Sequence, residues 1–119
     1  MKTINDLKEG DSIWLRVQYG TTLRTKEVRQ ATVKHIVRDD EPFSKLTGIR
    51  QDMIRIIEFD GASRIHYRPK DGETDVYSTN SISNVIMTYY TDKSRLIADL
   101  KQEKMRLLEE VDAFIEQLK

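Results

Sequence analysis

The sequence has 119 residues, which is enough for one small domain and a long helix but too few for two independent hydrophobic cores. Its 20 basic and 20 acidic residues cancel, so no overall field draws the chain to nucleic acid or to an anionic membrane. The absence of cysteine excludes disulfides, thiol catalysis and thiolate metal sites, and it is compatible with a reducing compartment.

The first predicted strand covers residues 13–19. Ile13 and Leu15 alternate with Trp14 and Arg16, which is the period of two expected of a strand with one buried face. The alternation places Trp14 on the outer face. There we expect it either to pack beneath the C-terminal helix or to form part of a binding surface.

The second predicted strand, Thr25–Arg38, is long enough to require a bulge or a bend, which we place near Arg29–Gln30. Its alternation puts Val33 and His35 on the apolar face, so we expect His35 to be a core histidine. A long surface loop is expected over Asp39–Gln51, which contains acidic residues, a proline and a glycine.

A hairpin is predicted in the middle of the chain. Met53–Phe59 and Ala62–Arg68 flank Asp60-Gly61, a strong signal for a tight type I′ turn, because both central residues of that turn have positive φ. A short strand is expected over Asp75–Ser78. Ser83–Tyr90 forms either one last strand or a helical turn.

Short strands with tight turns predict a small, strongly bent antiparallel barrel as one domain over residues 1–90. The run LKEGDSIWL at Leu7–Leu15, with the bent strands that follow, resembles the SH3-like barrel superfold. A barrel followed by a charged amphipathic helix is similar in layout to small uncharacterised proteins of bacterial phages and prophages. This resemblance implies a host-interaction or counter-defence factor, and it supplies no catalytic or binding residue.

Residues 91–119 are predicted to form one long amphipathic helix. Good helix formers dominate, and no glycine or proline occurs between Asp92 and Lys119. At ~1.5 Å per residue the helix is roughly 42 Å long, whereas the preceding domain has an expected radius of gyration of about 12 Å. The domain cannot cover such a helix, so we expect a homodimer or higher homo-oligomer. The alternative is one helix that lies on the barrel with a frayed end.

The predicted oligomerisation seam follows a heptad repeat whose a and d positions are apolar except for Lys104. A polar residue at an a position can fix register and oligomer number at some cost in stability. The seam residues named for self-association are Leu100, Lys104, Leu107, Val111, Phe114 and Leu118.

The sequence has no recognisable catalytic, phosphate-binding or metal-ligand motif, so we expect no enzyme, no cofactor and no metal. No apolar run approaches the ~18 residues of a membrane helix, and residues 1–10 are too polar for a signal peptide, so we expect a cytoplasmic protein without a membrane partner. The candidate ligand-binding residues combine aromatic and basic side chains. They are Trp14, Arg16, Arg64, His66 and Arg68.

The first functional hypothesis is therefore a non-enzymatic, self-associating module that binds a protein or a small charged ligand. The alternative is a nucleic-acid-binding barrel, because basic strands interleaved with aromatic residues suit phosphates and stacked bases. Charged residues on exposed strands also prevent aggregation of sheet edges, which is the structural explanation of the same pattern.

Overall fold

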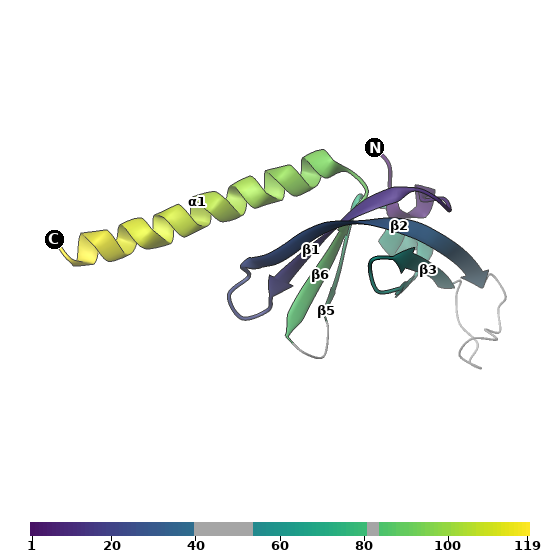
Figure 1. The fold of residues 1–119 in the computed structure, drawn as a ribbon, viewed down its shortest axis with the longest axis horizontal. Helices are drawn as coiled ribbons and strands as arrows, with labels where there is room; N and C mark the ends of the chain where they lie inside the picture. Colours follow the sequence, from purple (N-terminus) through teal and green to yellow (C-terminus); the bar gives the residue numbers. More distant parts are fainter. Residues whose placement is uncertain (40–53, 81–83) are drawn as a thin grey trace.

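The computed structural model describes residues 1–39, 54–80 and 84–119 (Figure 1). Within these ranges the chain forms a six-stranded antiparallel sheet that curls into a half-barrel, followed by one long α-helix. The elements in chain order are η1 (Ile4–Asp6), β1 (Ser12–Tyr19), β2 (Thr25–Asp39), β3 (Ile54–Asp60), β4 (Ile65–Tyr67), η2 (Pro69–Gly72), β5 (Val76–Asn80), β6 (Val85–Tyr90) and α1 (Lys93–Gln117). The predicted fold class, a mainly β α+β protein with a bent antiparallel sheet and a long C-terminal helix, is confirmed.

The strand order in the sheet is β4-β3-β2-β1-β6-β5, and every neighbouring pair is antiparallel. Curling brings the two edge strands close enough for side chains to connect them. The Tyr77 hydroxyl donates a hydrogen bond to the carbonyl of His66 at 3.1 Å, and the rings of Tyr67 and Tyr77 lie 5.9 Å apart. The Tyr89 hydroxyl donates to the carbonyl of Ser63 at 2.8 Å. Tyrosine side chains thus hold the half-barrel in its curled shape.

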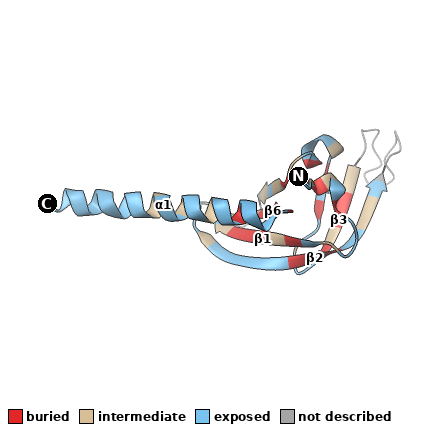
Figure 2. Ribbon diagram, turned by 90° about the horizontal axis from the view of Figure 1, so that it is seen from above, coloured by how far each residue is buried: buried red, intermediate tan, exposed pale blue. Residues whose placement is uncertain are grey.

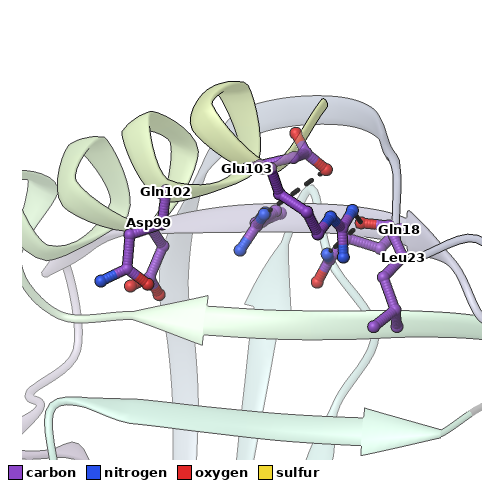
Figure 3. Close-up of a pocket in the computed structure, with 7 residues that line it drawn as sticks. Gln18, Leu23, Asp99, Gln102 and Glu103 are labelled. Carbon is purple, nitrogen blue, oxygen red and sulfur yellow. Dashed lines mark hydrogen bonds and ion pairs between the residues drawn. The ribbon is translucent and has the colours of Figure 1, made fainter. Parts of the chain in front are cut away.

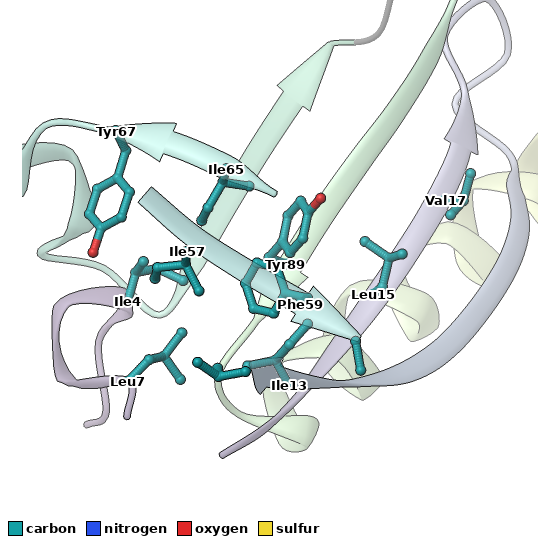
Figure 4. Close-up of a cluster of buried hydrophobic side chains, with 12 residues drawn as sticks. Ile4, Leu7, Ile13, Leu15, Val17, Ile57, Phe59, Ile65, Tyr67 and Tyr89 are labelled. Atoms are coloured by element: carbon teal, nitrogen blue, oxygen red, sulfur yellow. The ribbon is translucent and has the colours of Figure 1, made fainter. Parts of the chain in front are cut away.

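The hydrophobic core lies inside the curl (Figure 4). Ile13, Leu15 and Val17 of β1 point into it, as the alternation of β1 predicts. Ile4 and Leu7, from η1 and its C-terminal cap, pack against the same cluster and close one end. Burial of such side chains stabilises the fold by about 1.5–3 kcal/mol each.

β2 has two register shifts, and neither lies at the predicted Arg29–Gln30, which pairs regularly with β1. One leaves Lys26 as an extra residue opposite β1, and the other lies between Val33 and His35 in the pairing with β3. The second shift turns His35 out of the sheet, where its Nδ1 lies 3.1 Å from Glu9 Oε1, and Ile36 packs against the core. The prediction of a core histidine at His35 is therefore wrong, because one extra residue in a strand reverses the faces that follow it.

The predicted hairpin exists between β3 and β4, but it is not a two-residue type I′ turn. Gly61 has a φ of +92°, whereas Asp60 does not have a positive φ. Asp60 stays in β3 because it pairs with Thr32 of β2, and β4 begins only at Ile65. The predicted loop over Asp39–Gln51 lies outside the described residues except for Asp39, which ends β2.

Two further predictions concern the C-terminal third of the chain. Residues Val85–Tyr90 form a strand rather than a helical turn. α1 follows at once, and the Asp92 carboxylate caps it by accepting a hydrogen bond from the Ser94 amide at 2.9 Å. That hydrogen bond lowers the pKa of Asp92. No helix within the described residues is both long and apolar enough to span a membrane.

Only the first half of α1 rests on the sheet. Figure 2 shows the helix leaving the edge of the half-barrel, and the molecule is accordingly 64 Å long but only 28 Å and 22 Å across. Leu96 is the buried residue of the helix, and every residue from Leu108 to Lys119 is exposed. We call residues 93–107 the proximal half and residues 108–119 the distal half of α1.

Candidate functional site

The proximal half of α1 crosses the face of β1 opposite the hydrophobic core, and a buried arginine lies beneath it. Arg16 leaves β1 on that face, and its side chain is only 9% exposed. Its Nε donates to Thr25 Oγ1 at 3.0 Å, and its Nη2 lies 3.6 Å from Glu103 Oε1 of α1. Glu103 Oε1 also accepts hydrogen bonds from Thr25, at 2.7 Å from the amide and 3.1 Å from the hydroxyl.

Tyr90, the last residue of β6, extends this network towards the start of the helix. Its hydroxyl donates to Asp99 Oδ2 at 2.8 Å and accepts from Arg16 Nη1 at 3.4 Å. Burial raises the pKa of Tyr90 to about 12. We call Arg16, Thr25, Tyr90, Asp99 and Glu103 the helix clamp, because they join two strands, the start of β2 and two turns of α1.

A polar pocket of about 490 Å³ opens beside the helix clamp (Figure 3). Its far wall is the loop between β1 and β2, where Arg106 Nη2 donates to the carbonyls of Thr22 and Leu23 at 3.4 and 3.3 Å. Gln18 Nε2 donates to the same Leu23 carbonyl at 2.7 Å. The lining residues are Arg16, Gln18, Leu23, Asp99, Gln102, Glu103 and Arg106.

The chemistry of this pocket is that of a structural junction. Arg16, the most buried cation of the lining, already has a carboxylate, a hydroxyl and a phenol as partners. The lining residues include no histidine and no serine. They offer no pair of side chains that could act as nucleophile and base. Among the described residues, no group of three or more histidine or acidic side chains is placed to hold a metal ion.

The five predicted ligand-binding residues do not form one site. Arg16 is buried in the helix clamp, and Trp14 is half-buried on the same face of β1, opposite Tyr90 of β6. Arg64, His66 and Arg68 are exposed on or beside β4. Since β3 and β2 separate β4 from β1 in the sheet, the two groups lie on different parts of the molecule.

The six residues predicted for self-association fall into two groups. Leu100 and Leu107 are half-buried on the side of α1 that carries Leu96 and Glu103. Lys104 is exposed, as are the distal Val111, Phe114 and Leu118, which are 53%, 65% and 88% exposed. The apolar stripe that packs on the sheet thus continues along α1 beyond the edge of the sheet. There, no described part of the chain covers it.

Sequence reasoning missed the helix clamp. A signal for it exists, because Arg16 follows the period of two on an outer face, and Asp99 and Glu103 stand four residues apart on α1 beside the apolar stripe. Tyr90 gives no such signal, since its role depends on where α1 crosses β6.

No protein-family model, no curated protein and no solved structure matches this chain. The functional argument therefore depends on this molecule's own residues.

Proposed function

We propose that this protein is a non-enzymatic, self-associating interaction module, in which the half-barrel is a rigid head and α1 joins copies of the chain. The observation that supports this proposal is the exposure of large apolar side chains along α1 beyond the sheet. Leu108, Val111, Phe114, Ile115 and Leu118 are between 47% and 88% exposed.

Two physical arguments favour coverage of this surface by a partner. Contiguous apolar patches beyond a few hundred Å² are uncommon on monomers and mark interaction surfaces. An isolated helix shorter than about 12–15 residues is also marginal in water, and every residue of the distal half of α1 is exposed, so burial against the sheet does not stabilise it.

The helix clamp suits the head to this role. The proximal half of α1 is held on the head at four points along its length, by Leu96, Asp99, Glu103 and Arg106. The distal half therefore leaves the head in a defined direction. A fixed direction lowers the entropic cost of association, because less freedom is lost when two copies meet. In this proposal the partner is a second copy of this chain, and the exposed face of the head remains for another protein or a charged ligand.

The nucleic-acid alternative has less support. It needs one continuous basic surface, yet Arg16 is neutralised in the helix clamp and Arg29 lies 3.4 Å from Glu27. The exposed cations that remain on or beside β2 and β4 are divided by β3 into two groups, and each group makes few of the phosphate contacts that non-specific binding requires. They include Lys26, Lys34 and Arg38 of β2, and Arg64 and Arg68 beside β4.

The test compares the intact chain with a chain that ends at Arg106, by light scattering and circular dichroism. The shortened chain keeps every contact of the helix clamp, so we expect it to be a folded monomer. The intact chain should have at least twice the monomer mass of 14.0 kDa. A full-length variant with Leu108→Ser and Phe114→Ser serves as control, because it keeps the chain length and should also be monomeric.

An intact chain that is monomeric at ~100 μM would contradict the proposal. That concentration is far above the ~1 μM dissociation constant that corresponds to about −8 kcal/mol.

A further inference from the structure

We infer that two copies pair through antiparallel α1 helices, with the acidic distal half of each helix lying along the basic proximal half of the other. This inference rests on the proposed self-association and adds its direction and its recognition surface. The observations that carry it are the charge distribution along α1 and the side of the proximal half that the sheet leaves open.

Charge divides α1 into two halves of opposite sign. The proximal half has five basic residues against two acidic ones, a net charge of +3, and both of its acids belong to the helix clamp. The distal half has Lys119 against Glu109, Glu110, Asp112 and Glu116, a net charge of −3. A second copy therefore offers each half its electrostatic complement only if the helices run in opposite directions.

The proximal half also has a free apolar flank. The sheet covers the side of α1 that carries Leu96 and Leu107, but Ile97, Met105 and Leu108 are 42%, 63% and 55% exposed. Helical periodicity places Ile97 and Leu108 on one side of the helix, about 100° around from Leu96. The same side continues through Ile115 of the distal half, which is 47% exposed.

This flank allows antiparallel pairing without displacement of the head. The distal half of one copy can lie on the flank of the other, and twofold symmetry repeats the contact at the opposite end. Ile97 then lies opposite Leu118, and Lys101 comes beside Asp112 of the second copy. The paired segment, residues 97–118, is roughly 33 Å long at ~1.5 Å per residue.

Parallel pairing is disfavoured by the same features. It would place the four distal acids of one copy beside the same four acids of the other, and like charges at an interface oppose association. It would also need the proximal seam at Leu100 and Leu107, which already faces the chain's own sheet. Parallel helices could therefore meet only along the distal half.

The first arm of the test changes the charges. The double substitution Lys101→Glu and Lys104→Glu reverses two exposed charges on the proximal flank. We expect it to raise the dissociation constant of the dimer about 10-fold or more. Parallel helices would meet only along the distal half, away from both lysines, so the affinity of a parallel dimer would stay the same. The control reverses Lys34 and Lys70, two exposed lysines of the head, and should leave the affinity unchanged.

A compensating variant sharpens this arm. Addition of Asp112→Lys and Glu116→Lys to the two lysine reversals exchanges the signs of the two halves, so antiparallel pairing should recover most of the lost affinity. Raised salt should reduce the difference between the variants, because exposed charges are screened.

The second arm measures direction. The chain has no cysteine, so Gln117→Cys provides a single spin-label position on the exposed distal half. In the antiparallel pair the two label positions lie about 19 residues apart along the axis, or about 30 Å. In a parallel pair they lie about one interhelical distance apart, roughly 10 Å.

The outcomes separate the two proposals. A monomer in every experiment would overturn the self-association itself. A dimer with the short label distance would overturn the antiparallel inference and leave self-association standing. A long distance together with an unchanged affinity of the lysine variant would overturn the electrostatic basis of recognition, whereas a long distance with the expected loss and recovery supports the whole inference.

Discussion

Replacement of Glu103 by alanine should destabilise the fold far more than replacement of any of the exposed glutamates of α1. Glu103 is the carboxylate partner of Arg16, whose side chain is 9% exposed, and it also accepts the amide hydrogen of Thr25. Removal of one member of a buried ion pair leaves the other charge without compensation, which costs about 3–5 kcal/mol in buried sites.

The structure sets the expected loss of stability at or just below the lower limit of that range. Arg16 keeps its hydrogen bonds to Thr25 and Tyr90, and the Glu103 side chain is still 12% exposed, so water can reach the site. We therefore expect Glu103→Ala to lower the free energy of unfolding by about 2–3 kcal/mol.

Urea denaturation at one fixed protein concentration is the appropriate assay, because the stability of an oligomer depends on concentration. Glu109→Ala is the matched control, since it makes the same change on the exposed distal half and should cost within about 0.5 kcal/mol. Equal midpoints for Glu103→Ala and Glu109→Ala would refute the view that the helix clamp holds α1 on the sheet.

Two further predictions concern the distal half of α1 and the buried tyrosines. Phe114 is 65% exposed, so about two-thirds of the ~2–3 kcal/mol gained by burial of such a side chain is available in each copy. Phe114→Ala should therefore raise the dissociation constant about 100-fold or more, whereas Gln117→Ala, one turn further along the helix, removes no apolar side chain and should not, as titration by sedimentation would show. Burial raises the pKa of both Tyr89 and Tyr90 from 10.0 to about 12, so the neutral phenols favour the folded state. Stability should be unaffected by these groups below pH 10 and fall between pH 10 and about 12, and an unfolding midpoint that stays constant through this window would contradict that expectation.

The strands and the helix were predictable because their patterns are local. Ile13, Leu15 and Val17 alternate with polar or outward-facing residues, and β1 buries these three. The run from Asp92 contains no helix breaker, and α1 extends from Lys93 to Gln117. Period and propensity depend on neighbours in the sequence, so they can be read without knowledge of the tertiary structure.

The misplaced bulge shows where local patterns fail. The alternation through Val33 and His35 continues in the sequence, but the pairing of β2 with β3 skips a residue there. Strand curvature in the half-barrel depends on both neighbours of β2, so the position of the extra residue cannot be read from β2 alone. The same reason explains Asp60, which pairs with Thr32 instead of turning at once.

The helix clamp was unpredictable for a related reason. Arg16, Tyr90 and Glu103 lie far apart in the sequence, and they meet only because α1 turns back over β6 and β1. The exposure of the distal half, in contrast, could be predicted from the length of the helix alone, since a helix of 25 residues extends beyond a small domain. The contacts that cover the distal half involve a second molecule, so they cannot be predicted from the fold of one chain.

Sedimentation equilibrium of the intact chain, over concentrations from ~1 to ~100 μM, tests the central claim of self-association most directly. We expect an average mass that rises with concentration from near 14.0 kDa towards twice that value or above, and a chain ending at Arg106 that stays at its monomer mass. An intact chain that sediments at 14.0 kDa over the whole range would contradict the account, because the exposed apolar face of α1 would then have no second copy to cover it.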